Sequence, residues 1–196
     1  MDYTTLASVK LVKDAQSVTD DTLMSKLITE ASRTIDRYCA GGNLKSDNYF
    51  AFETITDELI TGQVDSNGRI ICRPRKPFVA SISSFSYRST PSSPWTTVDP
   101  AMIDISGYTV AAWAGLATRG NVTVKATYSG GLSASTAGLP ADIINAADLL
   151  AVRFYMEIKS GLADSIGVAE TGMMMYTKAL PIRLVEMLKP YKRVIV

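Results

Sequence analysis

The side chains that could do chemistry in this sequence are acids, bases, hydroxyls and two thiols, because its 196 residues include no histidine. That absence excludes Ser-His-Asp and Cys-His mechanisms, histidine metal sites and imidazole acid–base catalysis. The paired acids Asp20-Asp21 and Asp57-Glu58 could share acid–base work. Helix capping and turn formation explain both pairs more simply. We therefore predict that the protein is not an enzyme.

Motifs for metals, disulfides and nucleotides are also missing. Cys39 and Cys72 lie in apolar segments without metal-ligand spacing, so we expect buried thiols, with a disulfide as the less favoured alternative. DSNG at 65–68 begins like a calcium loop but lacks the later glutamate, and we interpret it as a tight turn. The sequence contains no GxxxxGK[ST], GxGxxG or GxSxG motif. We predict no cofactor and no metal.

Basic residues gather at two places in a chain whose 20 basic and 19 acidic residues nearly cancel. The near balance argues against attraction of the whole protein to nucleic acid or anionic membrane. Arg73, Arg75 and Lys76 could contact phosphate, but a solvated strand edge protected by charge and proline is the simpler interpretation. The second place is the C-terminus, where we expect residues 190–196 to form an extended basic tail. A DNA-binding module built on these two places is a less favoured function.

The surrounding segments predict helices at both ends of the chain. A short helix is expected over 4–14, and a stronger one over 18–42, where apolar residues recur at three- and four-residue steps. Thr19 or Asp20 can cap the start of that second helix, and Gly41-Gly42 can end it. A long helix beginning at Pro140 and a short one over 180–191 complete the set.

The middle of the chain has the composition of a sheet. β-branched and aromatic runs separated by turn residues predict five strands: FAFETIT, RIICR, FVASISSFSY, YTVAAWA and NVTVKATYS. We therefore predict an α+β fold in which 1–42 and 138–189 form a helical bundle. Residues 43–137 form a β-rich insertion. No apolar run approaches the ~20 residues of a membrane span, and the N-terminus lacks a signal-peptide pattern, so we expect a soluble protein made in the cytoplasm.

The helix after Pro140 carries two apolar stripes, and one of them needs a partner. The first stripe faces the core: Ile143, Ala147, Leu150, Ala151, Phe154 and Ile158. The second is Leu149, Val152 and Met156, which we assign to a subunit interface; burial of the whole helix within one chain is the alternative. Met173, Met174 and Met175 follow among glycines and are assigned to the same interface, because thioethers adapt to a neighbour. A surface loop with these methionines folded back onto the core is equally compatible.

The order of these parts resembles the head-tail connector (head-completion, or adaptor) proteins of long-tailed double-stranded DNA bacteriophages. The resemblance is carried by these segments: YTTLASVK, DDTLMSKLITEASRTIDRYCAG, KPFVASISSF, VTVKATYSGG, LPADIINAADLLAVRFY and LVEMLKPYKR. The β-rich middle departs from the smallest members. The resemblance implies a structural virion protein of the phage neck, which forms a dodecameric ring beneath the portal that extends the DNA channel and joins head to tail.

The resemblance also implies partners and no catalytic residue. The expected partners are the portal protein, the next neck or tail-completion protein, further copies of the same chain, and DNA that passes through the channel without specific binding. Portal binding is implied for the last helix and the tail, with these candidates: Arg183, Leu188, Lys189, Tyr191, Lys192 and Arg193. A stopper or tail-completion protein at another neck position is the nearest alternative.

Overall fold

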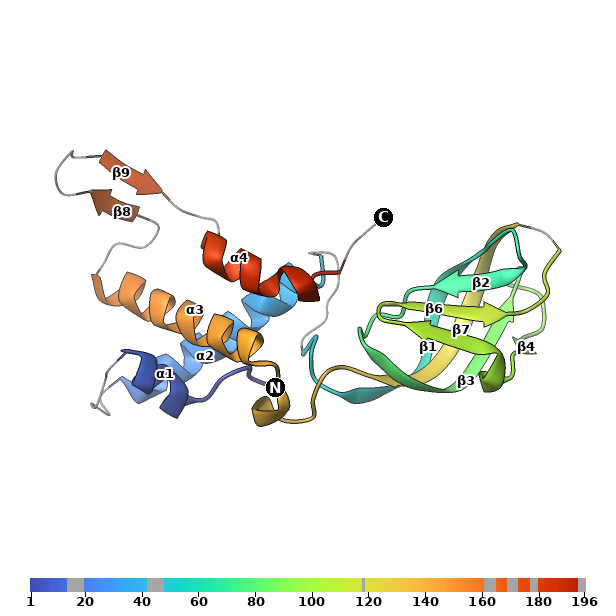
Figure 1. Ribbon diagram of the computed structural model, residues 1–196, viewed down its shortest axis with the longest axis horizontal. Helices are drawn as coiled ribbons and strands as arrows, with labels where there is room; N and C mark the ends of the chain where they lie inside the picture. The colour runs from blue at the N-terminus through green and yellow to red at the C-terminus, as the bar shows by residue number, and fades with distance from the viewer. Residues whose placement is uncertain are drawn as a thin grey trace. The chain divides into compact units, whose positions relative to one another are not determined.

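The structure is a computed structural model that describes residues 1–13, 20–41, 48–117, 119–160, 165–168, 173–176 and 180–193. The chain divides into two compact units (Figure 1). Met1–Asn48 with Ser135–Val196 make the helical unit, and Tyr49–Ala134 make the β unit. Helices and an antiparallel sheet therefore occupy separate parts of the chain, which confirms the predicted α+β class.

Four helices build the helical unit. They are α1 (Leu6–Lys13), α2 (Asp21–Cys39), α3 (Ala141–Ser160) and α4 (Ile182–Leu188). The other three helices all pack against α3, with α2 making the most extensive contact. A hairpin of β8 (Ser165–Val168) and β9 (Met173–Tyr176) lies between α3 and α4 in the sequence. All four predicted helices are present, with ends shifted by a few residues.

The ends of α2 follow one prediction and depart from another. Gly41 adopts a φ of 82°, the left-handed conformation expected of the residue that stops the helix. At the start, the side chain of Asp20 forms no capping hydrogen bond to the helix, so the expected cap is wrong for this residue. Thr19 and Gly42 lie outside the described residues. The Asp20 carboxylate instead accepts hydrogen bonds from Tyr155 and Lys159 of α3.

The C-terminal segment also differs from the prediction of an extended tail. Lys189–Tyr191 form a 3-10 turn that continues α4. The same kind of turn also occurs in the helical unit at Thr136–Gly138, before α3. The backbone N–H of Arg193 then donates to the carbonyl of Cys39 at 2.8 Å. Residues up to 193 therefore fold back on the end of α2, and residues 194–196 lie outside the described part.

The β unit is a seven-stranded sheet in which every pair is antiparallel. Its strands are β1 (Glu53–Val64), β2 (Arg69–Cys72), β3 (Val79–Arg88), β4 (Thr96–Thr97), β5 (Ile103–Ser106), β6 (Thr109–Trp113) and β7 (Gly120–Gly130). Their order is β4-β3-β7-β1-β2-β6-β5, and β5 also approaches β3, so the sheet curls around its core. The five predicted strands are present, although β1 runs on to Val64. β4 and β5 were not predicted.

One face of this sheet is buried and the other faces solvent. Along β7, Val122, Val124, Ala126 and Tyr128 are buried, and the residues between them are only partly covered. These side chains pack with Phe85, Ile70 and their neighbours in one apolar cluster. The alternation predicted for this strand, with one wet face, is confirmed.

The basic cluster between β2 and β3 is the clearest difference from the sequence expectation in the β unit. Lys76 is only 3% exposed, and its ammonium lies 2.5 Å from Glu53 Oε1. Its backbone N–H donates to the Tyr128 hydroxyl at 3.0 Å, which in turn donates to Glu58 at 2.5 Å. An ion pair between a buried lysine and an exposed glutamate, with hydrogen bonds beside it, thus replaces the expected solvated edge at this lysine. Burial and the Glu58 hydrogen bond both raise the pKa of Tyr128.

Candidate functional site

Two surfaces of the helical unit contain six of the twelve predicted binding residues. We call Leu149, Val152 and Met156 the α3 strip. The C-terminal face is the outer side of α4 and the turn after it, formed by Ile182, Arg183, Lys189 and Lys192.

The α3 strip lies opposite the buried face of its helix. Six positions at helical spacing are buried against the other helices: Ile143, Ala146, Ala147, Leu150, Ala151 and Tyr155. Met156 is 56% exposed, while Leu149 and Val152 are partly covered. α3 is therefore not buried on all sides within one chain. Ile158, which was assigned to the core stripe, is exposed because it lies in the last turn, beyond the final buried residue.

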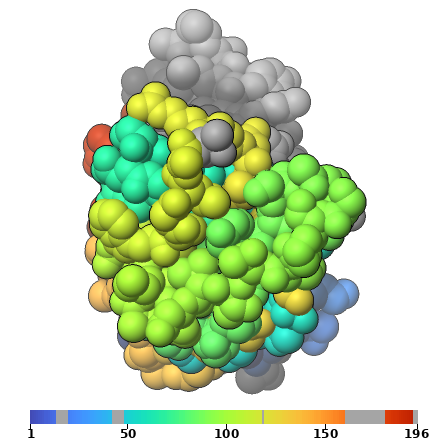
Figure 2. Space-filling model, turned by 90° about the vertical axis from the view of Figure 1, so that its right-hand side faces the viewer, coloured from blue at the N-terminus to red at the C-terminus, as the bar shows by residue number. Residues whose placement is uncertain are grey.

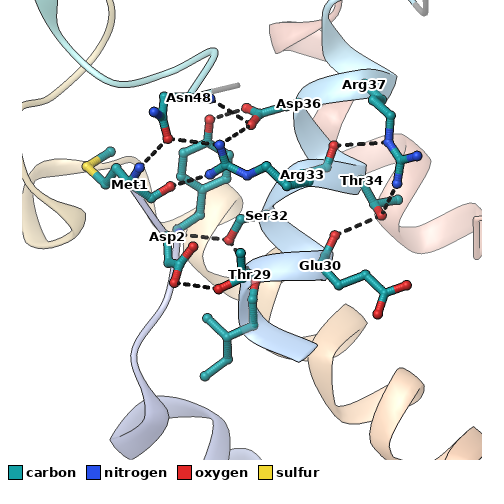
Figure 3. Close-up of polar contacts among 12 residues, drawn as sticks. Met1, Asp2, Thr29, Glu30, Ser32, Arg33, Thr34, Asp36, Arg37 and Asn48 are labelled. Carbon is teal, nitrogen blue, oxygen red and sulfur yellow. Dashed lines mark hydrogen bonds and ion pairs between the residues drawn. The ribbon is translucent and has the colours of Figure 1, made fainter. Parts of the chain in front are cut away.

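A polar network fixes the segment before α1 against α2 (Figure 3). The buried Asp36 carboxylate accepts hydrogen bonds from the Tyr3 hydroxyl and, at 2.9 Å, from the backbone N–H of Asn48. Arg33 lies 3.2 Å from the same carboxylate. The Tyr3 backbone N–H donates to Ser32 Oγ at 2.9 Å. With its charge paired and its oxygens bonded, Asp36 can be buried at a modest energetic penalty.

A second buried acid, Asp148, attaches α1 to α3. Its side chain is 3% exposed, and one oxygen accepts a hydrogen bond from Thr4 Oγ1. The other oxygen accepts from Ser8 Oγ at 2.6 Å. Because Thr4 precedes α1 and Ser8 lies within it, Asp148 fixes both the position and the rotation of this short helix.

A third acid, Asp20, connects the start of α2 to the last turns of α3. The Tyr155 hydroxyl donates to its Oδ2 at 2.5 Å, and Lys159 Nζ donates to its Oδ1 at 2.9 Å. The Tyr155 hydrogen bond and then the Lys159 hydrogen bond lower the pKa of Asp20, and the same carboxylate raises the pKa of Lys159. Lys13 Nζ lies 3.6 Å from the Tyr155 ring centroid. The end of α3 that carries Met156 is thus fixed to both N-terminal helices.

The C-terminal face combines an anchored inner side with an outer side that exposes three cations and one acid, Glu186. Leu184 and Leu188 are buried, so Leu188 holds α4 in place and presents almost no surface to a partner. Ile182 is 78% exposed, and Arg183, Lys189 and Lys192 are also exposed. Lys192 Nζ lies 4.8 Å from the ring centroid of Tyr38.

Tyr191 and Arg193 lie at the edge of the C-terminal face. Both are partly covered, and the pKa of Tyr191 is raised by burial and by nearby Asp142. Of the six portal candidates, three cations of α4 and the turn after it are exposed: Arg183, Lys189 and Lys192. Tyr191 and Arg193 lie beside them, while Leu188 lies beneath.

The predicted methionines fall on a hairpin strand. Met173, Met174 and Met175 belong to β9, and pair with Val168, Gly167 and Ile166 of β8. Their side chains lie outside the described part of the structure. Their assignment to a subunit interface stays a prediction.

The described residues offer little other chemistry. They contain no group of three or more acids or cysteines placed to hold a metal ion, and none of their helices is both long and apolar enough to cross a membrane. Cys39 and Cys72 are free and buried, as predicted. Burial raises the pKa of each thiol to about 12, which keeps both thiols protonated and unreactive at neutral pH.

Sequence reasoning missed several surface and buried residues. Leu11 of α1 is 83% exposed and Val12 is also exposed, although α1 packs beside α3. The exposed Ile182 begins α4 and was not among the candidates. Asp148 was detectable as the one acid in the apolar run from Ile143 to Val152, a sign that it has a buried hydrogen-bond partner.

Comparisons with known proteins find the fold but no close relative. No model of a known protein family matches the chain, and no curated protein matches it. A chain from a structure of the neck of an empty GTA particle, with C6 symmetry, is similar with a TM-score of 0.52 and 15% identity. A chain from the virion of a native gene transfer agent (GTA) particle is similar with a TM-score of 0.52 and 16% identity. Each match covers 97% of this chain and 90% of the other, which establishes a shared fold over nearly the whole length.

Proposed function

We propose that this protein is a structural component of the neck of a tailed-phage-like particle. Copies of the chain form a ring, dodecameric in the resembling connector family, beneath the portal; the ring extends the DNA channel and joins head to tail. The observation that carries the proposal is the fold likeness over 97% of the chain to proteins of gene transfer agent particles, one of them in a neck. The independent sequence resemblance to head-tail connectors supports the same function.

The α3 strip supports ring formation. A closed ring uses a head-to-tail contact, in which one surface of a subunit meets a different surface of the next. The strip supplies one such surface, because its apolar side chains lie away from the core of their own unit. The exposed Leu11 and Val12 of α1 offer a second apolar surface on the same unit. The strip itself is rimmed by the Arg153–Glu157 ion pair, with 2.6 Å between Nε and Oε1.

The C-terminal face supports attachment to the portal. The exposed side chains of α4 and its turn include Ile182, three cations and one acid, Glu186, a combination suited to a partner surface with an apolar pocket and a mainly acidic rim. The turn after α4 is held by the Arg193 backbone hydrogen bond to Cys39, so this face is already ordered before binding. Little ordering entropy is then lost on contact.

The first test is the mass of the purified protein in solution, alone and after mixing with DNA-filled, tailless phage-like heads. We expect a monomer that becomes a ring-sized complement on the heads. A protein that stays monomeric and ignores heads would refute the proposed function.

The second test reverses charge on the C-terminal face. Arg183→Glu with Lys189→Glu changes two exposed side chains and leaves Leu184, Leu188 and the Arg193 hydrogen bond in place. We expect a folded protein that no longer binds heads. Lys26→Glu with Arg37→Glu on exposed α2 positions makes the same charge change as a control, and should bind normally. Equal binding by both variants would exclude this face from portal attachment; deletion of Lys189–Val196 is a coarser version of the same test.

A further inference from the structure

The outer face of the β unit has an uneven charge distribution. The sequence contains no Asp or Glu between Asp65 and Asp99, and none between Asp104 and Asp142. Strands β3, β4, β6 and β7 therefore contain no acidic residue at all. Any cation on the solvent face of β3 and β7 lies on a surface whose own strands supply no opposing charge.

Cations do occupy that face, in register. Asn121, Thr123 and Lys125 alternate along β7 on the side opposite its buried residues, and the exposed Arg119 comes directly before the strand. Arg88 of β3 pairs with Thr123, and Ser86 pairs with Lys125. The β1 residues on the other side of β7 are uncharged: Leu59 opposite Lys125, Thr61 opposite Thr123 and Gln63 opposite Asn121. β1 contains three acids, Glu53, Asp57 and Glu58, and all of them come beyond Lys125, at the bulge or past it. Asp57 lies next to the face, because its backbone N–H donates to Thr127 Oγ1 at 3.0 Å.

Trp95 orients two of these cations. The Arg88 guanidinium carbon lies 4.5 Å and Lys125 Nζ lies 5.2 Å from the centroid of the indole ring. Arg88 Nη1 also donates to the Pro91 carbonyl at 2.8 Å. Two flexible side chains, both partly exposed, are thus held near one ring, which reduces the entropy lost when they bind an anion. The Arg88 Nε atom is buried, so Arg88 reaches an anion only through its terminal nitrogens.

Hydroxyl groups surround the cations. Thr97 of β4 shares a hydrogen bond of 3.3 Å with Ser86, and Thr90 shares one of 2.7 Å with Ser93 in the exposed loop between β3 and β4. Figure 2 shows that the green and yellow part of the chain, from β3 to the start of β7, forms a continuous surface. Arginine, lysine, serine and threonine are the side chains that most often contact DNA phosphates.

We propose that this face of β3 and β7, with Arg88, Arg119 and Lys125 as its cations, contacts the phosphate backbone of duplex DNA without reading its sequence. Six residues of extended strand separate Arg119 from Lys125, about 20 Å, the length of about six base pairs. No element of the face is shaped to enter a groove as a helix would. Three cations make a weak contact that breaks easily, as a channel through which DNA moves requires.

The inference deepens the proposed function, on which it rests only for the presence of DNA. The test uses the full chain in solution and needs neither a ring nor a head, so its failure would leave the neck assignment standing. A fluorescently labelled duplex of about 20 base pairs is titrated with protein, and its anisotropy is followed at several salt concentrations. With three phosphate contacts, log affinity should fall against log salt with a slope of about −3.

The decisive variant is Arg119→Gln with Lys125→Gln, compared with Lys26→Gln and Arg37→Gln on α2 as a control of equal net charge. Native tryptophan emission verifies folding of the β unit, because Trp95 and Trp113, the only tryptophans, both lie in it. We expect the affinity of the decisive variant for the duplex to fall about tenfold or more, and its slope of log affinity against log salt to become about two units less steep. The control variant should keep the affinity and the slope of the unmodified protein. A duplex of shuffled sequence should bind as well as the first.

Three results would overturn the inference. One is an absence of binding by the unmodified protein at low salt. Another is an equal loss in the two variants, which would make the attraction a property of net charge alone. The third is displacement of the duplex by polyglutamate at matched or lower charge concentration, which would identify an acidic protein surface as the partner instead.

Discussion

The two units use charge in opposite ways. In the helical unit, acids are buried as connectors: Asp36 and Asp148 fix the N-terminal segment and α1 to the longer helices, while apolar side chains such as Met156 remain at the surface. In the β unit, the core is an apolar cluster, and the outer face of β3 and β7 carries cations with no acid on those strands. The helical unit thus exposes surfaces suited to protein partners, and the β unit exposes one suited to a polyanion.

This difference makes the two units separately measurable. Tryptophan emission follows the β unit alone, because both tryptophans lie in it, and helical circular dichroism follows the helical unit. A substitution in one unit should move one signal and leave the other nearly unchanged.

The largest effect is expected from Gly131→Ala in the β unit. Gly131 has a φ of 114°, and a Cβ there would lie 2.6 Å from the carbonyl carbon of Ala51 and 2.7 Å from Cα of Phe52. We expect the free energy of unfolding of the β unit to fall by about 3 kcal/mol or more, seen in the urea midpoint of tryptophan emission. Gly107→Ala is the control, since its φ is 55° but no atom lies within 4 Å of the added carbon; it should lose about 1 kcal/mol. Similar losses in the two variants would show that the contact with Ala51 is unimportant.

The next effect is expected from Asp148→Ala in the helical unit. The substitution leaves the hydroxyls of Thr4 and Ser8 without their acceptor, which should lower stability by about 2 kcal/mol in the helical signal. Asp142→Ala, at the exposed start of the same helix, should lose only about 0.5 kcal/mol through the helix dipole. A shift of the tryptophan transition as large as that of the helical one would contradict the separation of the units.

A smaller, pH-dependent effect is expected from Asp20. Its pKa is lower in the folded protein than the ordinary value of 3.8, chiefly because of the hydrogen bonds from Tyr155 and Lys159. Its stabilising contribution is therefore complete above pH 3.8 and is lost as the pH falls through the lower pKa of the folded state. Urea midpoints of the helical signal should fall more steeply below pH 3.8 for the unmodified protein than for Asp20→Asn. Identical pH profiles would mean that the carboxylate is not held by Tyr155 and Lys159.

The sequence predicts elements that repeat locally and misses pairs that meet over long distances. The periods of α2 and β7 identify both elements and the buried side of each, and the two-sided pattern of α3 correctly separates Met156 from the core. Ile158 continues the spacing of the core stripe but lies beyond the last buried residue of α3. The spacing of apolar residues does not show where the contact with the other helices ends. The sequence predicts a solvated Lys76, because Glu53, its partner in the folded chain, is 23 residues away. The hydroxyl partners of Asp148 lie 140 or more residues away.

The central claim is that the α3 strip joins neighbouring copies in a ring. The most direct test counts the copies of Met156→Asp bound to each DNA-filled, tailless head and compares that number with that for the unmodified protein. Met156 is 56% exposed, so the variant should fold with a stability change of about 0.5 kcal/mol or less. The account predicts a folded monomer that forms no ring and leaves heads bare, with Leu149→Asp behaving similarly. A full ring of Met156→Asp on the heads would contradict it.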